Sequence, residues 1–443
     1  MHSILVLGAG MVAGPLVRHL LAGGCRLTVT SLALADAEAL IDGHPQGTPL
    51  VVDLADEAAL DRLVAAHDLV VSLVPYGFHP LVARHCLKHR RHLVTASYVA
   101  PAMQALDAEA RAAGLVFLNE MGLDPGIDHM SAMRVIHDVQ GRGGVVRSFR
   151  SYCGGLPAPE AADNPLGYKF SWSPQGVLMA SRNGATYLLD GRVVETAPER
   201  LFRDMRLVNV PGGGDFEAYP NRDSLAYREI YGLGEGLRTL MRGTLRNLGW
   251  CDTMFRFRQV GLLETEPVPC AGMTRGAYVR RLLGAEAGQD IRAAAARRMG
   301  LCPEALPPSN LAWLGLGDDT PLAGDSIAPL AVLGAAMLEK LSFRPGERDM
   351  IVMQHEFQAV FADAGREERI TSTMVDFGVP GGPSAMARTV SLPAAIAALA
   401  ILDGRIAGRG VLRPVHPEIY GPVLDELAGL GIICNETTTT FET

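Results

Sequence analysis

The sequence lacks the cysteine spacing that marks a zinc site or a disulfide framework. Its seven cysteines include no C-x-x-C pair and no Cys/His cluster at metal-binding spacing, so we expect no metal. Their number is odd, and no charged leader precedes the strand-like run at residues 4–7. We therefore expect reduced thiols and a cytoplasmic location.

The sequence also lacks an excess of positive charge and a long apolar run. The 40 Lys and Arg against 48 Asp and Glu give a net charge of -8, which argues against nucleic acid as a partner. An anionic substrate would have to be attracted by a few local arginines or helix N-termini. The most apolar stretch, residues 390–402, contains Pro393 and is shorter than the roughly 20 residues of a membrane span. We interpret it as a buried helix and expect no membrane partner.

What the 443 residues do contain is typical of a loop-rich globular α/β enzyme with two or three domains: 48% are hydrophobic, 49 are Gly and 28 are Pro. In the first 125 residues, short β-branched runs alternate with segments of helical period, which predicts a doubly wound parallel sheet. The expected strands are residues 3–7, 26–31, 49–53, 68–74, 92–95 and 115–119. Ligands bind such sheets at the carboxyl ends of the strands.

The pattern changes near residue 145, where we expect a second domain. A long strand is predicted over residues 145–153, ending at the Gly/Pro-rich stretch 154–159. Residues 235–345 show mainly helical periods. The remaining expectations are helices within 289–299 and 330–341, a Pro-rich break at 303–308, a hairpin of strands 349–362 and 368–377, a helix from Ser384 and a frayed tail at 437–440.

A glycine-rich motif directly follows the first predicted strand. Gly8-Ala9-Gly10-Met11-Val12-Ala13 matches G-x-G-x-x-A at the head of a helix. Gly8 permits the tight turn, Gly10 lets the backbone approach a pyrophosphate, and Ala13 allows the helix to pack closely on the sheet. The motif and its context predict a dinucleotide cofactor.

The choice between NAD(H) and NADP(H) depends on the end of the second strand. The sequence there is Thr28-Val29-Thr30-Ser31-Leu32, without the acidic residue that holds a ribose hydroxyl or the arginine that meets a 2′-phosphate. Ser31 can hydrogen-bond either ribose. Because no carboxylate repels a phosphate, NADP(H) is favoured and NAD(H) stays possible. Asp36 competes for the ribose, but we expect it in the first turn of the next helix.

The densest polar cluster of the first half, residues 119–129, follows the sixth predicted strand. Asp124 and Pro125 fit a helix start, with Asp124 as the N-cap and Pro125 as the first helical residue, although a cap can also be a ligand. We expect His129 to be a packed structural histidine within that helix.

Four stretches carry a resemblance to a known family: residues 120–129, 151–160, 163–173 and 218–224. They closely resemble the glutamate-forming saccharopine dehydrogenases, also called saccharopine reductases. The resemblance spans nearly the whole chain and weakens between about residues 255 and 345. It implies a homodimeric pyridine-nucleotide enzyme of lysine metabolism that interconverts saccharopine with 2-aminoadipate 6-semialdehyde and L-glutamate by reduction of an imine.

The resemblance further implies three domains: a variant Rossmann domain of residues 1–125 and 384–443, an α/β substrate domain of 126–240 and 346–383, and a helical domain of 241–345. The family's nucleotide contacts fall on Ala9, Gly10, Met11, Val12, Ser31, Asp53, Val74, Ser97, Leu123, Asp124 and Pro125. Its substrate contacts fall on Ser97, Tyr98, Asp124, Cys153, Arg222 and Thr244. One departure concerns cofactor preference, because the NADP-dependent fungal members have an arginine where Leu32 stands here.

Physical chemistry suggests roles for these residues. Arg222 is able to clamp a substrate carboxylate, or else is a solvated arginine paired with Asp223. Asp124 is our choice for the base that takes the proton of the substrate amine. Cys153 is either a contact in the cleft or an inert buried thiol, and we predict that Asp124 and Arg222 converge across a cleft.

Two alternatives stay open. One is a relative acting on another imine, such as carboxynorspermidine, whose cationic product would favour an acidic pocket. The other is a catalytically silent nucleotide-binding sensor.

Overall fold

The computed structural model describes residues 1–442, and the chain forms two compact units. The first comprises Met1–Val145, Phe361–Arg366 and Met374–Thr443, and the second comprises Val146–Val360 and Glu367–Thr373. The division into three domains stays a prediction. Residues 126–145, which we had assigned to the substrate domain, lie in the first unit.

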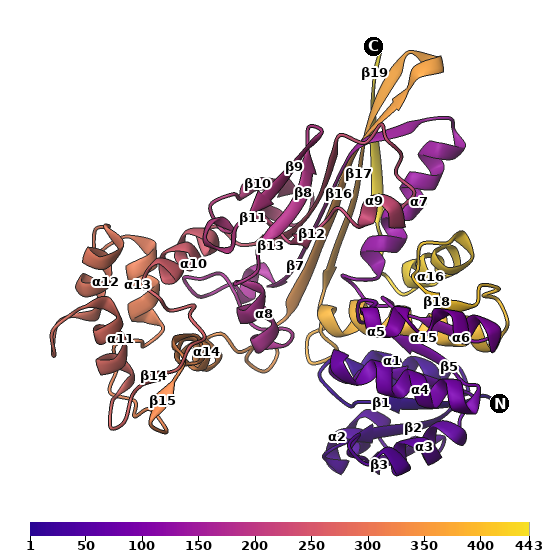
Figure 1. Cartoon of the computed structure of the whole chain (residues 1–443), viewed down its shortest axis with the longest axis horizontal. Coiled ribbons are helices and arrows are strands. Elements are labelled where there is room, and N and C mark those ends of the chain that lie inside the picture. Colours follow the sequence, from indigo (N-terminus) through magenta and orange to yellow (C-terminus); the bar gives the residue numbers. More distant parts are fainter. Residues whose placement is uncertain (443) are drawn as a thin grey trace. The chain divides into compact units, whose positions relative to one another are not determined.

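A parallel sheet forms the centre of the first unit (Figure 1). Its seven strands are, in spatial order, β18 (Gly410–Leu412), β6 (Val116–Leu118), β5 (His92–Thr95), β4 (Leu69–Ser72), β1 (Ser3–Leu7), β2 (Arg26–Ser31) and β3 (Gly47–Val51). This order confirms the predicted doubly wound Rossmann sheet. The C-terminal segment completes it as the resemblance implied, since Val411 of β18 pairs in parallel with Phe117 of β6.

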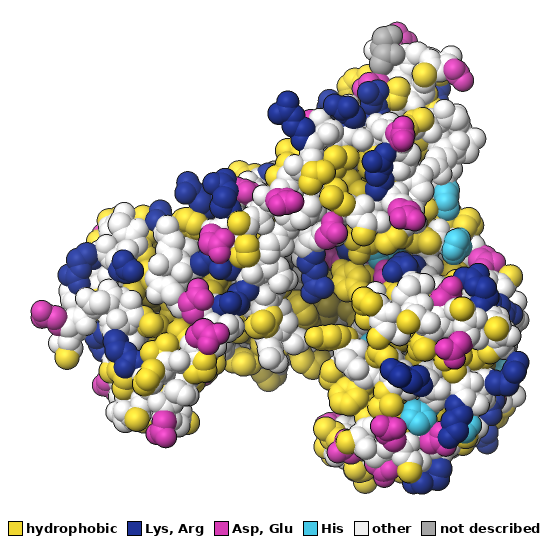
Figure 2. Space-filling view, in the orientation of Figure 1, with side chains coloured by type: hydrophobic (Ala, Val, Ile, Leu, Met, Phe, Trp, Pro, Cys, Tyr) yellow, Lys and Arg dark blue, Asp and Glu magenta, His cyan; other side chains and the backbone are white. Residues whose placement is uncertain are grey.

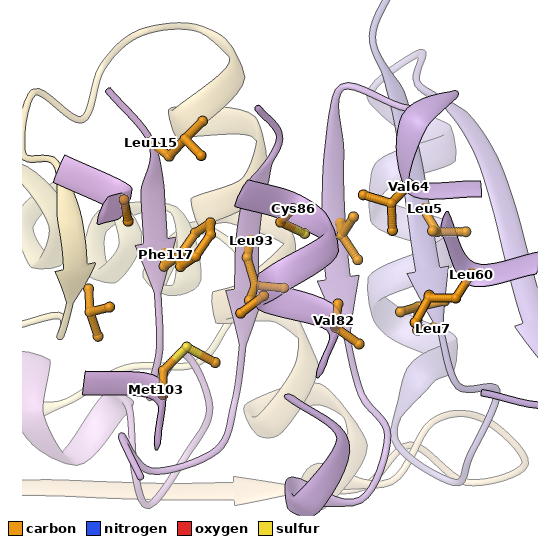
Figure 3. Packing of buried hydrophobic residues seen from close by; sticks show 14 residues of the cluster. Leu5, Leu7, Leu60, Val64, Val82, Cys86, Leu93, Met103, Leu115 and Phe117 are labelled. Carbon is orange, nitrogen blue, oxygen red and sulfur yellow. The ribbon is translucent and has the colours of Figure 1, made fainter. Parts of the chain in front are cut away.

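Helices connect and cover these strands (Figure 1). They are α1 (Ala13–Ala22), α2 (Leu34–Ile41), α3 (Glu57–Ala65), η1 (Tyr76–Phe78), α4 (His79–His89), α5 (Pro101–Gln104), α6 (Asp107–Ala112), α7 (Ile127–Gly141), α15 (Ala385–Leu402) and α16 (Pro417–Gly429). All five residues of β1 are buried, as a central parallel strand covered on both faces requires. The close view of the core shows Leu93, Phe117 and Cys86 of α4 packed together (Figure 3). Burial raises the pKa of the Cys86 thiol, which marks it as a structural cysteine.

Helix α15 is the predicted apolar helix. The Ser384 side chain caps it by accepting a hydrogen bond from the Ala387 amide at 3.0 Å, and Pro393 lies inside it. Among residues 1–442, this one helix is long and apolar enough to cross a membrane, and 78% of it is buried. It packs on α1, so it serves as a core helix of the first unit, as expected.

The second unit contains a mixed sheet. The main strands are, in spatial order, β10 (Arg206–Val210), β11 (Gly214–Pro220), β13 (Thr239–Arg246), β7 (Val145–Pro157), β16 (Asp349–Phe361) and β17 (Arg366–Phe377). Strand β8 (Ala185–Leu189) also pairs with β13, and β9 (Arg192–Thr196) and β12 (Arg222–Asp223) pair with β8. The predicted end of the long strand at Gly154 is wrong, because β7 continues to Pro157. A Cβ on Gly154 would lie 2.7 Å from the Leu245 carbonyl oxygen, so the glycine serves close packing against β13 rather than a turn.

The helical part of the second unit agrees with the predicted pattern in outline. Its elements are η2 (Pro159–Ala161), α8 (Pro174–Ala180), η3 (Pro198–Arg200), α9 (Tyr227–Ile230), α10 (Trp250–Gln259), β14 (Val268–Pro269), α11 (Arg275–Leu283), α12 (Ile291–Met299), α13 (Leu306–Trp313), β15 (Ser326–Ile327) and α14 (Pro329–Lys340). Strand β13 crosses the predicted boundary at residue 240. The Pro-rich stretch is not a simple break, because Pro307 and Pro308 lie in the first turn of α13, where proline is tolerated.

The last predicted elements have mixed outcomes. The hairpin is confirmed: η4 (Ala362–Ala364) and Gly365, with φ of 59°, connect β16 to β17. The predicted frayed tail is wrong, because β19 (Asn435–Glu442) is a strand. Its four consecutive threonines are β-branched and favour extended backbone.

Candidate active site

The glycine-rich turn has the predicted form. Gly8 has φ of 102°, and its amide donates to the Thr30 carbonyl oxygen at 3.1 Å. A Cβ on Gly8 would lie 3.1 Å from the Leu73 carbonyl oxygen, so this position requires glycine. At Gly10, by contrast, a Cβ would meet no atom within 4 Å. Gly10 therefore leaves open space beside the turn, as a bound pyrophosphate requires.

A cavity of about 560 Å³ lies against this turn. It is lined by Ala9, Gly10, Met11, Gly14, Pro15, Arg18, Asp36, Ala39, Leu40, Gly381, Gly382, Pro383, Ser384 and Ala387. Of the predicted cofactor residues, Ala9, Gly10 and Met11 line it, while Val12 and Ala13 form the start of α1. The size of the cavity and the free backbone at Gly10 fit part of a dinucleotide.

The other predicted cofactor residues follow neighbouring strands of the same sheet. Ser31 ends β2, and Asp53 follows β3, where its Oδ1 accepts a hydrogen bond from the Ala55 amide at 2.9 Å. Val74 follows β4, with its Cγ1 3.5 Å from where a Cβ on Gly8 would lie. These positions lie at the carboxyl edge of the sheet, where we had predicted them.

Ser31 and Asp36 interact at the expected ribose position. The Ser31 hydroxyl donates to Asp36 Oδ2 at 3.2 Å, and Asp36 lies in the first turn of α2 as predicted. Leu32, directly after β2, is 76% exposed. No cation stands at the end of β2 in the stretch 28–32.

The ends of β5 and β6 bring two predicted substrate residues together. The Tyr98 hydroxyl donates to Asp124 Oδ1 at 3.0 Å, and both side chains are half-buried. Leu123 beside them is 5% exposed, and the Asp124–Pro125 peptide bond is cis. The predicted cap is wrong, since α7 begins at Ile127 with Gly126 as its N-cap.

Glycine is required at that N-cap. Gly126 has φ of 148°, and a Cβ there would overlap the Gly122 carbonyl. Its amide donates to Asp128 Oδ1 at 2.6 Å, so Asp128 takes the local role that we had given to Asp124. The Asp124 carboxylate accepts a hydrogen bond from the Tyr98 hydroxyl.

A buried ionic network beneath this loop was not predicted. Glu120 is 2% exposed, and its Oε1 accepts hydrogen bonds from the Val99 amide at 2.9 Å and from Arg413 Nε at 3.0 Å. Its Oε2 lies 2.8 Å from His129 Nε2, and His129 is fully buried in α7, as expected of a structural histidine. Burial opposes ionisation of Glu120, but His129, Arg413 and the Val99 amide outweigh it and lower the pKa. Glu120 thereby ties the loop after β5 to the loop after β6.

A second buried network, around His79, was also missed. His79 begins α4 and is 4% exposed, with Nδ1 2.9 Å from Ser72 Oγ and Nε2 2.8 Å from Ser97 Oγ. Burial lowers the pKa of His79 to about 4, so the imidazole is neutral at pH 7. It therefore holds the side chain of Ser97, a predicted cofactor and substrate contact. The one feature of the sequence that could have pointed to this network is a histidine shortly after a buried strand.

In the second unit, the strand register places two further predicted residues side by side. Thr244 of β13 pairs with Cys153 of β7 on one side and with Tyr219 of β11 on the other. Paired residues share a sheet face, and Arg246, two residues after Thr244, lies on that face too. Cys153, Tyr219 and Arg246 are buried at 7%, 6% and 5% exposure. The predicted pair Cys153 and Thr244 therefore has an arginine beside it that sequence reasoning missed.

Arg246 is a buried cation without an acidic partner. Its Nη1 donates to the Leu245 carbonyl oxygen at 2.8 Å, and its guanidinium lies over the rings of Tyr168 at 4.9 Å and Trp250 at 5.5 Å. Its Nε has no hydrogen-bond partner, and it makes no ion pair among residues 1–442. Buried arginines are normally paired, so this guanidinium is suited to an anionic ligand.

Arg222 lies on a strand rather than in the predicted loop. With Asp223 it forms β12, pairing in parallel with Ala185 of β8, and it is exposed with φ of 55°. The Asp223 carboxylate accepts a hydrogen bond from the Leu225 amide at 2.8 Å. Its role as a carboxylate clamp stays a prediction, as do the roles of the other site residues.

Comparisons with known proteins agree with this geometry. The saccharopine dehydrogenase NADP binding domain model matches residues 4–118, and the saccharopine dehydrogenase C-terminal domain model matches residues 122–432. The chain belongs to the saccharopine dehydrogenase family. Both family models meet at the loop that carries Asp124.

Several relatives show how much of the chain the family likeness covers. The chain is 40% identical over 453 residues to saccharopine dehydrogenase [NADP(+), L-glutamate-forming] of Pyricularia oryzae, covering 98% of each chain. It is 40% identical over 446 residues to the protein of that name from Saccharomyces cerevisiae, covering 98% of this chain and 99% of the relative. The solved structure of the apo, L-Glu-forming saccharopine dehydrogenase from Saccharomyces cerevisiae matches with a TM-score of 0.91 and 38% identity, over 99% of this chain and 100% of that one. The likeness to this family thus extends over the whole fold.

Proposed function

We propose that this chain interconverts saccharopine with 2-aminoadipate 6-semialdehyde and L-glutamate. Membership in the family and near full-length identity to relatives named for this reaction support the proposal. The observation that carries it is Arg246, a buried guanidinium without an acidic partner beside Cys153 and Thr244. Saccharopine bears three carboxylates and supplies such a partner.

The proposed cofactor is NADP(H), as the family's nucleotide-binding model and the names of its relatives suggest. Gly8, Ala9, Gly10 and Met11 would hold it at the cavity against α1, and Ser31 would contact its ribose. When bound, this cofactor would supply hydride chemistry at the substrate carbon that becomes the aldehyde carbon, and one water would hydrolyse the resulting iminium to the semialdehyde and glutamate. The residues of the chain bind and orient the substrate and move its proton.

Asp124 would handle the proton of the substrate nitrogen. A protonated secondary amine cannot expel hydride, because its nitrogen lone pair is occupied, so a base must take the proton first. A half-buried carboxylate suits this task, and the Tyr98 hydroxyl at 3.0 Å holds its Oδ1 in place. The same negative charge would stabilise the iminium that forms when hydride leaves.

Carboxylate recognition would fall to Arg246 and Arg222. Each guanidinium is able to grip a carboxylate through two parallel hydrogen bonds, and such charged hydrogen bonds contribute about 1.5–3 kcal/mol. Thr244 and Cys153, adjacent on paired strands, would line the same part of the pocket, with Cys153 as a contact rather than a nucleophile. That Asp124 and Arg222 converge stays a prediction from the sequence.

The proposal includes a small-molecule substrate, a homodimer and a cytoplasmic location, with neither nucleic acid nor membrane as a partner. On the face shown in Figure 2, Lys and Arg are interspersed with Asp and Glu. Such mixed charge suits a protein that attracts an anionic metabolite through a few local arginines.

The test is an absorbance assay on the full-length protein. NADPH or NADH oxidation is followed with 2-aminoadipate 6-semialdehyde plus glutamate, and NADP⁺ reduction is followed with saccharopine. We expect turnover in both directions and faster turnover with NADPH. No oxidation of either cofactor would refute the proposal and favour a nucleotide-binding sensor. The Arg222→Ala variant should raise KM for saccharopine, whereas an enzyme for a polyamine adduct would lose nothing by that change.

A further inference from the structure

Arg18 is an unexplained cation at the cofactor cavity. It lies on α1, five residues after the glycine-rich motif, and its side chain is exposed and lines the cavity. It makes no hydrogen bond or ion pair with any other residue of the described range 1–442. Most exposed arginines need no function, so the case for a function of Arg18 depends on where its guanidinium lies.

The guanidinium lies back over Gly14, toward the N-terminus of α1. A Cβ on Gly14 would stand 3.3 Å from Arg18 Nη1 and 3.4 Å from Nη2, with Leu40 Cδ2 of α2 at 3.6 Å. A larger residue at position 14 would therefore displace the guanidinium from this place. Gly14 thus leaves room for the Arg18 guanidinium beside α1, near Leu40 of α2 and at the cavity.

The cavity lining carries one charged side chain of each sign. Among the described residues that line it, Arg18 is the single cation and Asp36 the single anion. The Asp36 carboxylate accepts a hydrogen bond from Ser31, and α1 has no acidic residue in its first turn. Leu32, at the end of β2, supplies no charge of its own.

We propose that Arg18 binds the 2′-phosphate of NADP(H) and gives the chain its preference over NAD(H). The inference rests on the proposed function, since it deepens the choice of cofactor. It accounts for an NADP-type enzyme without an arginine at position 32: the cation comes from α1 instead of from the end of β2. A guanidinium suits a phosphate because its N–H groups match two phosphate oxygens.

Binding of two adenosine nucleotides to the full-length protein tests this without turnover. Isothermal titration compares adenosine 2′,5′-bisphosphate with adenosine 5′-monophosphate on the wild type and on Arg18→Met. The wild type should bind the bisphosphate more tightly. The variant should bind it roughly 10- to 100-fold more weakly, with a change below about twofold for the monophosphate. The matched control is Arg62→Met, which removes an exposed arginine from the last turn of α3 and should change neither affinity.

Two outcomes would overturn the assignment: a wild type that binds both nucleotides equally, or an Arg18→Met variant that keeps its affinity for the bisphosphate. Unchanged thermal unfolding of the variant checks that it is folded. The proposed reaction fails separately. A wild type that prefers the bisphosphate but turns over no saccharopine would refute the reaction and leave the role of Arg18 intact.

Discussion

Replacing Arg246 with methionine should raise the stability of the fold and weaken the binding of saccharopine. In the absence of substrate, this buried guanidinium has one hydrogen bond to a carbonyl oxygen and two aromatic faces but no carboxylate. Burying an ion costs several kcal/mol, whereas a cation–π contact returns only about 0.5–2 kcal/mol. Methionine fills similar volume without the charge. We expect the free energy of unfolding of Arg246→Met to rise by about 1–3 kcal/mol.

The same change should damage substrate binding. Loss of a charged hydrogen bond of about 1.5–3 kcal/mol corresponds to an increase of roughly 10- to 100-fold in KM for saccharopine. The affinity for NADP⁺ should stay the same, because the cofactor cavity is lined by other residues. A gain in stability together with a loss of binding is the signature of a charge kept for a ligand.

Thermal unfolding with and without saccharopine is the assay. At the same concentration, saccharopine should raise the Tm of the wild type much more than that of Arg246→Met. The control is Arg275→Met: Arg275 is 3% exposed and pairs with Glu339 through two hydrogen bonds of 2.7 and 3.0 Å. This control should lose stability and keep its KM. A destabilised Arg246→Met with a normal KM would show that Arg246 is structural and refute the reasoning.

Three further predictions concern the first unit. Gly10→Ala should fold normally, since its Cβ meets no atom within 4 Å, yet weaken NADP⁺ binding at least about tenfold by calorimetry; Gly429→Ala, equally unhindered, is the control. Glu120→Gln should lower the free energy of unfolding in urea by about 3 kcal/mol at pH 7. Because the folded pKa of Glu120 lies below its unfolded value, its contribution to stability exists above about pH 4.3 and is lost in acid. The free energy of unfolding of the variant should therefore change less with pH in acid than that of the wild type; an equal change in both proteins would contradict this. The wild type should lose stability as pH falls from about 6.5 toward 4, because the folded His79 imidazole resists protonation, and His79→Gln should not show this loss. Urea midpoints that fall equally in both proteins between pH 7.5 and 4.5 would argue against it.

The parts of the fold that local sequence determines were predictable. The turn at Gly8 is marked in the sequence by the G-x-G-x-x-A motif directly after a strand, and the parallel sheet follows from hydrophobic runs of the right length. The cap of α15 at Ser384 is likewise a local hydrogen bond. Patterns of this kind need no knowledge of distant segments.

The parts that failed depend on distant segments. Gly154 is typical of a turn until Leu245 of the neighbouring strand comes within contact distance. Arg246 sits in a strand whose alternation does not say that both faces are covered, so nothing in the sequence marked it as buried. Glu120 acquires its role from His129 nearby in the sequence and from the distant Val99 and Arg413, the latter almost 300 positions later in the chain.

The most direct test of the account concerns Asp124 as the group that takes the substrate proton. Single-turnover reduction of NADP⁺ by saccharopine is followed at 340 nm for the wild type and Asp124→Asn, with NADP⁺ binding measured alongside. The account predicts that the variant binds NADP⁺ normally and transfers hydride about 10²- to 10⁴-fold more slowly. A variant that transfers hydride at the wild-type rate would contradict it.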